Sequence, residues 1–156
     1  MRLRALAKIN LGLDVIGKRE DGYHEVRMIM QTINMYDQLE IEKKDEPGIS
    51  ITTNLPTDER NLVYKAAKLL MDEFDIQEGI TVELQKFIPV AAGMAGGSSD
   101  AAATMIGMNR LFNLGLTVKE MMKRAVAIGA DVPYCLLRGT ALAEGIGEQL
   151  RPLPPC

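Results

Sequence analysis

Cysteine and histidine are scarce in this sequence, and tryptophan is absent. Its 156 residues include two cysteines, Cys135 and Cys156, and one histidine, His24. Two cysteines do not make the disulfide framework of a small secreted domain, and a single histidine does not complete a Cys/His cluster for zinc. The composition therefore excludes a disulfide scaffold and a zinc module, and it fits a reducing compartment.

A surplus of positive charge and long apolar runs are also missing. The 18 lysines and arginines stand against 21 aspartates and glutamates, which gives a formal net charge of -3. Nucleic-acid binders usually gather a basic surplus on one face, so a small-molecule partner is favoured over nucleic acid. No run approaches the ~20 consecutive apolar residues of a bilayer span, and polar residues interrupt the N-terminus where a signal peptide would be apolar. We expect a cytoplasmic protein with no membrane partner.

What is present is the balance of an ordinary globular domain, with 47% apolar and 25% charged residues. A chain of this length buries roughly 70% of its unfolded surface, which suffices for one core. The sequence stops after Pro154 and Pro155 at Cys156, in an extended segment that resembles a cut at a domain linker.

The N-terminal third alternates with period two. Over residues 3–15 the apolar side chains, Leu11 among them, fall on one parity and the polar side chains, including Lys8, on the other. This pattern predicts a long half-buried strand. A polar, turn-rich stretch at 17–22 follows, and period two resumes over 26–41, so we expect an antiparallel neighbour.

Helix and strand patterns alternate in the remainder, which predicts an α+β arrangement of a sheet and helices. The helices are indicated by apolar stripes and by capping residues. We expect a strand at 49–51 after a turn at 45–48, a helix from about 61 to 75 after a polar loop with Asp58, a strand at 80–86, a helix after 98, a helix from the capping box at 117–120 to about 129, and short strands at 134–137 and 140–143.

The segment 91–99 is the most unusual part of the sequence. Apart from Met94, no side chain in it exceeds a hydroxymethyl group, so a polyanion can approach the backbone closely. Ser98, Ser99 or Asp100 is expected to cap the next helix, whose free amides and dipole then favour an anion at the same place. The segment matches neither a Walker A loop nor a dinucleotide fingerprint. Its alternatives are a phosphate site, a flexible linker or a tight turn.

Four motifs together resemble the signatures of the GHMP small-molecule kinases. The strongest begins at Pro89, and Met94 stands in it where many relatives have leucine, a volume-conserving exchange. In the family's order the motifs are Ala7-Lys8-Ile9-Asn10-Leu11, Asp21-Gly22-Tyr23-His24-Glu25, Pro-x-x-x-Gly-Met-Ala-Gly-Gly-Ser-Ser-Asp-Ala-Ala, and Gly129-Ala130-Asp131-Val132-Pro133.

The resemblance implies the ribosomal protein S5 domain 2-like fold, as in the N-terminal, ATP-binding domain of these kinases, over residues 1–156. The family's C-terminal domain is absent from this chain. The implied reaction transfers the γ-phosphoryl group of ATP to the 2-hydroxyl of a cytidyl diphosphate of methylerythritol, in the non-mevalonate route to isoprenoids. ATP and Mg²⁺ are the implied cofactors, with Mg²⁺ bridging the nucleotide phosphates.

The resemblance also assigns the site residues. Asp131 matches the catalytic base, and Lys8 matches a lysine that lowers its pKa and steadies charge. Taken alone, Lys8 is a solvated strand lysine and Asp131 a turn residue. Asp100 stays open, because its charge suits a helix N-terminus but opposes a phosphate. The remaining assignments are Asn10, Tyr23 and His24 for the cytidyl end, Asn61 and Lys86 for adenine, and Pro89, Val90, Ala91, Ala92, Gly93, Met94, Ala95, Gly96, Gly97, Ser98 and Ser99 for the phosphates.

Two alternatives remain beside this hypothesis. One is a GHMP kinase for another small alcohol, such as mevalonate or homoserine, against which the motif around His24 argues. The other is a non-catalytic module on the same fold, either an RNA-binding domain or a domain that binds nucleotide without turnover. Net negative charge weakens the RNA version.

Overall fold

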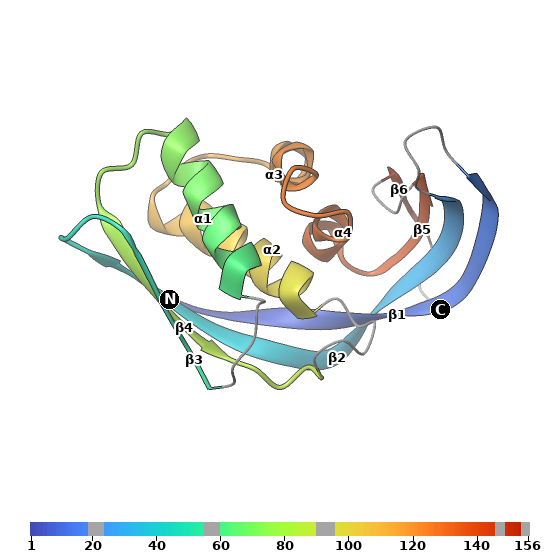
Figure 1. Cartoon of the computed structure of the whole chain (residues 1–156), viewed down its shortest axis with the longest axis horizontal. Helices are drawn as coiled ribbons and strands as arrows, with labels where there is room; N and C mark the ends of the chain where they lie inside the picture. Colours follow the sequence, from blue (N-terminus) through green and yellow to red (C-terminus); the bar gives the residue numbers. More distant parts are fainter. Residues whose placement is uncertain (19–23, 55–59, 90–95, 146–148, 154–156) are drawn as a thin grey trace.

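The fold is taken from a computed structural model that describes residues 1–18, 24–54, 60–89, 96–145 and 149–153. Within these ranges six strands form one sheet, and the helices all lie on one side of it (Figure 1). The α+β class is therefore confirmed. The elements are β1 (Arg2–Lys18), β2 (His24–Lys44), β3 (Ile49–Thr53), α1 (Arg60–Glu73), β4 (Gly79–Gln85), α2 (Gly96–Leu111), α3 (Val118–Ala125), α4 (Val132–Leu137), β5 (Thr140–Gly145) and β6 (Gln149–Pro152).

Strand β2 joins the two halves of the sheet. β1 runs antiparallel along one edge of β2, from the pair Arg2↔Glu40 to the pair Lys18↔His24. On the other edge, β4 pairs with residues 38–44 of β2 and β5 pairs with residues 26–31, both antiparallel. β3 adds parallel to β4, and β6 adds antiparallel to β5. The long strands curve around the helices, so residues from both halves of the sheet can reach one helix layer (Figure 1).

The alternation predicted for β1 holds as far as Ala7 and then fails. Ala7 is buried, but so is Lys8, which is 5% exposed, whereas Leu11 is 49% exposed. The pairing with β2 shifts register between Leu6 and Lys8. Such an irregularity re-aims the side chains that follow it. The prediction that Leu11 lies on the buried parity and Lys8 on the solvated parity is wrong, and this change brings a lysine into the interior.

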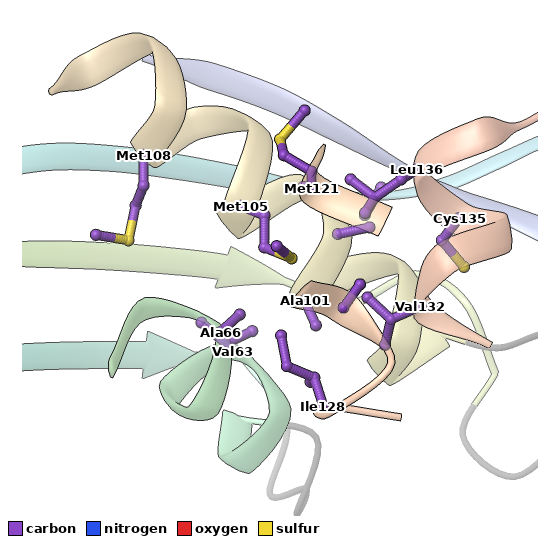
Figure 2. Close-up of a cluster of buried hydrophobic side chains, with 14 of the residues drawn as sticks. Val63, Ala66, Ala101, Met105, Met108, Met121, Ile128, Val132, Cys135 and Leu136 are labelled. Carbon is purple, nitrogen blue, oxygen red and sulfur yellow. The ribbon is translucent and has the colours of Figure 1, made fainter. Parts of the chain in front are cut away.

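Helix α2 is the centre of the helix layer and packs against α1, α4, β1 and β2. At Gly107 a Cβ atom would lie 2.7 Å from Cδ1 of Leu3 and 2.8 Å from Cδ1 of Ile41, so the helix rests directly on the sheet. Figure 2 shows side chains from all the described helices meeting in one apolar cluster. The labelled members are Val63, Ala66, Ala101, Met105, Met108, Met121, Ile128, Val132, Cys135 and Leu136.

The capping box predicted at 117–120 is confirmed. The Glu120 N–H donates to Oγ1 of Thr117 at 3.2 Å, and the Thr117 N–H donates to Oε1 of Glu120 at 3.3 Å. The helix it opens, α3, ends at Ala125, earlier than the predicted end at Gly129. None of the helices in the described ranges is long and apolar enough to span a membrane.

Two sequence predictions about element boundaries are wrong. Residues 134–137 belong to helix α4 instead of a strand, and Pro133 lies in its first turn, where a missing N–H is tolerated. Helix α2 begins at Gly96, so Ser98, Ser99 and Asp100 lie inside its first turns and do not cap it. Both errors concern short segments whose conformation depends on packing more than on local pattern.

Candidate active site

Lys8 and Asp131 come from distant parts of the sequence, and the fold brings both close to Cys135. Burial is the main cause that raises the pKa of the Cys135 thiol to about 12; the charge of Asp131 raises it further, and the charge of Lys8 opposes this. Asp131 precedes α4, whose Tyr134 hydroxyl lies 2.9 Å from Oγ1 of Thr32, and Thr32 is the register partner of Lys8 on β1. The fold therefore brings together the segments that carry Lys8 and Asp131, and the roles assigned to these two residues stay predictions.

The carboxylate of Asp131 is not used to hold its own helix. Asp131 is the N-cap residue of α4, with φ -88 and ψ -12, and its side chain makes no capping hydrogen bond. Its backbone carbonyl accepts from the Cys135 N–H at 3.2 Å. The backbone of Asp131 is therefore fixed by the helix. The residue is half-buried, so a ligand can reach its carboxylate.

Lys8 is a buried cation without an ion pair among the described carboxylates. Its Nζ donates to Oδ1 of Asn10 at 3.2 Å, and Asn10 itself is exposed. A neutral amide orients the ammonium group without neutralising it. Among the described residues, Lys8 therefore has an amide as its hydrogen-bond partner and forms no ion pair with Asp131.

A ring of hydrogen bonds fixes α4 against the strand that carries the register partner of Lys8. That partner is Thr32. The hydroxyl of Tyr134 donates to the Gly139 carbonyl at 2.5 Å and lies 2.9 Å from Oγ1 of Thr32, and the Gly139 N–H donates to the same Oγ1 at 2.9 Å. These bonds hold α4 and Gly139 against β2, the strand that also pairs with β1. Sequence reasoning missed Tyr134, because it placed that residue in a strand and no local pattern marks its partners.

The first turn of α2 is anchored to β1 next to Lys8. The hydroxyl of Ser99 donates to the Leu6 carbonyl at 2.6 Å, and Ser99 is buried. Gly96 and Gly97 open the helix, and Ser98 is half-buried. The first N–H groups of a helix have no partner within it, and they carry a partial positive charge. The turn therefore presents backbone donors close to Lys8.

Lys86 lies between two carboxylates in the interior. Its Nζ is 2.5 Å from Oδ2 of Asp37 and 2.7 Å from Oδ2 of Asp100, and all three side chains are 0% exposed. Since no part of the Lys86 side chain reaches solvent, an adenine contact at this position has to involve the backbone. Sequence reasoning did not single out Asp37, although its parity with the buried Leu39 and Ile41 on β2 would have indicated an inward carboxylate.

The other predicted site residues are placed only in part. Asn61 is exposed in the first turn of α1, and Pro89 is exposed at the end of its described range. His24 begins β2, but only its backbone is described. Their ligand contacts stay predictions. Outside the described residues lie Tyr23, Val90, Ala91, Ala92, Gly93, Met94 and Ala95.

Comparison with known proteins identifies the family of this chain. Residues 61–139 match the family model described as the GHMP kinases N terminal domain. The chain belongs to the GHMP kinase family. The matched segment contains Lys86, Ser99, Asp100, Asp131 and Tyr134 of the site just described, while Lys8 precedes it.

Three relatives show how far the similarity extends. The 4-diphosphocytidyl-2-C-methyl-D-erythritol kinase of Lachnoclostridium phytofermentans is 62% identical over 156 residues, which are 98% of this chain and 54% of the relative. A crystal structure of 4-(cytidine 5'-diphospho)-2C-methyl-D-erythritol kinase matches with a TM-score of 0.86 and 38% identity, covering 98% of this chain and 55% of that one. The mevalonate kinase of Methanococcus jannaschii, at 17% identity and a TM-score of 0.75, covers 99% and 56% and shows the fold alone.

This GHMP kinase chain spans about half the length of the curated relatives it matches. Its described site is nevertheless built from several separate elements of the chain itself. β1 supplies Lys8, the start of α2 supplies the backbone donors, and the residue before α4 is Asp131.

Proposed function

We propose that this GHMP kinase domain takes part in transferring the γ-phosphoryl group of ATP to the 2-hydroxyl of 4-diphosphocytidyl-2-C-methyl-D-erythritol, a step in the non-mevalonate route to isoprenoids. The observation that carries the proposal is that β1 next to Lys8 holds the first turn of α2 through Leu6, while α4, which follows Asp131, is bonded to Thr32, the register partner of Lys8. The 62% identity to a relative of that name supports this substrate. The same proposal gives a cytoplasmic enzyme whose partner is a small molecule, not nucleic acid or a membrane.

The proposed phosphoryl transfer uses the Asp131 carboxylate and the Lys8 ammonium group. The Asp131 carboxylate accepts the proton of the substrate hydroxyl, whose oxygen forms a bond to the γ-phosphorus as the bond to the β-phosphate oxygen breaks and ADP leaves. The Lys8 ammonium offsets negative charge as it develops on the reacting oxygens. Because Lys8 is not paired with a carboxylate in the described ranges, its charge is available for this role.

The first turn of α2 is the proposed binding site of the ATP phosphates. Gly96 and Gly97 offer backbone N–H groups without a side chain in the way, and no acidic residue stands in that first turn. Ser99 contributes its backbone N–H, because its hydroxyl already donates a hydrogen bond to the Leu6 carbonyl. Residues 89–95 and Ser98 complete the proposed set, with Asn61 and the backbone of Lys86 near adenine.

Mg²⁺ is proposed as the partner of ATP, and it supplies positive charge to the phosphates when bound. In the described ranges no group of three His, Cys, Asp or Glu side chains could hold a metal ion. Mg²⁺ readily keeps water and substrate phosphates as ligands, so a site with few protein ligands fits this chain.

The decisive experiment is phosphorus NMR of the purified chain with Mg²⁺, ATP and 4-diphosphocytidyl-2-C-methyl-D-erythritol. Formation of ADP together with a new phosphomonoester is the expected result. A second sample uses the chain fused to the part of the Lachnoclostridium phytofermentans relative that this chain does not cover. If neither sample forms the phosphomonoester, or if the fusion phosphorylates mevalonate or homoserine instead, the proposed reaction is wrong.

The cytidyl end of the substrate is assigned to Asn10, Tyr23 and His24. His24→Ala is expected to raise KM for the cytidyl substrate about tenfold and to leave KM for ATP unchanged, since loss of one hydrogen bond to a ligand costs about 1 to 1.5 kcal/mol. Steady-state kinetics with each substrate varied in turn measures both constants. Equal weakening of both would remove His24 from the substrate site.

A further inference from the structure

Strand register places Asp37 and Lys86 opposite each other inside the protein. Gln38 of β2 pairs with Gln85 of β4, so Asp37 and Lys86 form the next step along the same two strands. On β4 the residues of alternate parity are buried as far as Ile88, and Lys86 falls on that parity while Phe87 is exposed. The strand pattern therefore forces a lysine inward, and a buried lysine needs a partner.

The Asp37 side chain binds the backbone just after the end of β4 and also pairs with Lys86. Its Oδ1 accepts the N–H of Phe87 at 2.7 Å and the N–H of Ile88 at 2.8 Å. Its Oδ2 accepts from Nζ of Lys86. The backbone donors that β4 would otherwise present to a continuing strand are thus satisfied by one side chain, and the chain leaves the sheet at this point.

Lys86 then connects this point to the start of α2. Its Nζ contacts Oδ2 of Asp100 at 2.7 Å, so residue 86 and residue 100 meet although the glycine-rich segment lies between them. The backbone N–H of Lys86 also donates to Oδ1 of Asn54 at 2.7 Å, next to the end of β3. Both ends of the segment are therefore held at one buried place.

The charges of this group do not balance unless one carboxyl is protonated. Two carboxyls and one ammonium are all fully buried. Asp37 accepts three donors, whereas Oδ1 of Asp100 is buried without a hydrogen-bond partner. An ionised carboxylate with an unsatisfied buried oxygen is costly, so the proton belongs on Asp100.

The titration behaviour of Asp100 agrees with this assignment. Burial is the main cause that raises the pKa of Asp100 to about 9, the neighbouring carboxylate of Asp37 raises it further, and Lys86 opposes the rise. Burial raises the pKa of the Cys135 thiol on α4 to about 12, so the thiol stays neutral over the same range. The charges of Asp131 and Asp100 raise this pKa further, and those of Lys8 and Arg138 lower it. α1 contributes apolar side chains to the cluster around α2, such as Val63 and Ala66 (Figure 2).

We propose that Asp37, Lys86 and Asp100 are positioning residues that hold the first turn of α2 in place for the ATP phosphates, with Asp100 kept uncharged so that it does not repel them. This inference rests on the proposed function, because it concerns the same phosphate site. It resolves the conflict at Asp100: the side chain that fixes the turn is an acid, yet the turn remains attractive to an anion.

Phosphate binding to matched variants tests the proposal. The probes are MgATP and inorganic triphosphate, and the dissociation constant is measured by calorimetry at pH 7.5. Lys86→Met is expected to weaken binding of both probes at least tenfold, while Asp100→Asn, which imitates the uncharged acid, stays within threefold of the parent. Lys68→Met removes an exposed lysine 2.9 Å from Asp72 and is the control, with no change expected.

The pH profile supplies a readout that a merely structural role would not move. As pH rises from 7.5 to 10, triphosphate binding by the parent is expected to weaken relative to Asp100→Asn, because Asp100 gains a negative charge near pH 9. Carbon-13 NMR of the labelled Asp100 carboxyl is expected to show the protonated form at pH 7. Neither measurement on the parent or on Asp100→Asn requires Lys86→Met to fold.

The proposal is overturned if Asp100→Asn loses affinity as strongly as Lys86→Met, if the two pH profiles coincide, or if the Asp100 carboxyl is ionised at pH 7. Its failure is distinguishable from failure of the proposed function. Binding of MgATP by the parent tests the ATP site, and only the variants and the carboxyl resonance test the role of the buried group. A parent chain that binds neither probe contradicts both.

Discussion

Two buried lysines lie near aspartates in this domain, and their surroundings differ. Lys86 contacts Asp37 and Asp100, and all three side chains are cut off from solvent. Among the described residues, the hydrogen-bond partner of Lys8 is the amide of Asn10, while the carboxylate of Asp131 is half-buried and does not cap its helix. The same two residue types thus form a closed group in one place and an open pair in the other.

The difference shows what a charged side chain needs in order to act on a ligand. In the closed group the charges neutralise one another, so they hold β2, the exit of β4 and α2 together. In the open pair neither side chain forms an ion pair in the described ranges, so both are proposed to act on a third molecule. The predictions below test this contrast, starting with the largest expected effect.

Asp131→Asn should abolish most of the activity while the fold survives. Loss of the proposed base lowers kcat by about 10²- to 10⁴-fold, with KM for ATP little changed. The free energy of unfolding should change by less than about 1 kcal/mol, since this side chain makes no capping hydrogen bond. ADP release and urea unfolding measure the two effects. Unchanged turnover would exclude Asp131 as the base.

Lys86→Met should show the opposite result, a large loss of stability. Removing the lysine leaves a buried carboxylate without its cation, which costs about 3 to 5 kcal/mol. Urea unfolding at pH 7 measures the change. A loss below 1 kcal/mol would mean that the closed group does not hold these segments together.

Asp100→Asn should remove a pH dependence of stability. The folded-state pKa of about 9 lies above the ordinary value of 3.8, so between these values the folded chain keeps a proton that the unfolded chain has lost. The parent is therefore destabilised as pH rises through this window, by at most about 1.4 kcal/mol per pH unit. The asparagine variant lacks this dependence, so its stability relative to the parent should rise by up to about 3 kcal/mol from pH 6 to pH 8. Parallel urea curves at both pH values would contradict the protonated state of Asp100.

Tyr134→Phe should disturb the open pair from a distance. It removes the hydroxyl that donates to the Gly139 carbonyl and meets Thr32, at a cost of about 1 to 2 kcal/mol in unfolding free energy. Because α4 also carries Asp131 at its start, kcat should fall about tenfold. The exposed Tyr64 on α1 offers the matched control, Tyr64→Phe. Equal effects of the two variants would deny Tyr134 a positioning role.

The exposed pair Lys68 and Asp72 on α1 should matter least. The two groups are 2.9 Å apart, slightly farther than the buried pairs at 2.5 and 2.7 Å, and their side chains are 53% and 63% exposed. Solvent screens such pairs, so Lys68→Met should leave the urea midpoint of unfolding unchanged within error. Urea unfolding beside Lys86→Met makes the comparison direct, and a loss of stability as large as that of Lys86→Met would show that burial is not the deciding difference.

Local pattern predicted the elements whose signals are local. The stripe of apolar residues over α1 and the capping box at Thr117 and Glu120 need only neighbours in sequence, and both are confirmed. The strand predicted at 134–137 is wrong, because a short apolar run suits either conformation until packing decides. The motif resemblance named Lys8 and Asp131 and the family, and the roles of these residues stay predictions.

Two features of the site depend on contacts that no local pattern records. Lys8 turns inward because β1 and β2 shift register between Leu6 and Lys8, which alternation along one strand does not show. The partner of Lys86 on α2 is Asp100, which sequence reasoning left open between attracting and opposing a phosphate.

The sequence by itself determined the α+β class and most of the helices and strands, because periodicity and capping depend on residues that are close in sequence. Its motifs also named the candidate site residues. Only the tertiary structure decided which charges face one another. A buried ion pair depends on strand register and helix packing over the whole domain, and its consequence depends on solvent exclusion. For that reason the sequence named Lys8, Lys86, Asp100 and Asp131 as candidates, while the fold separated them into a closed group and an open pair.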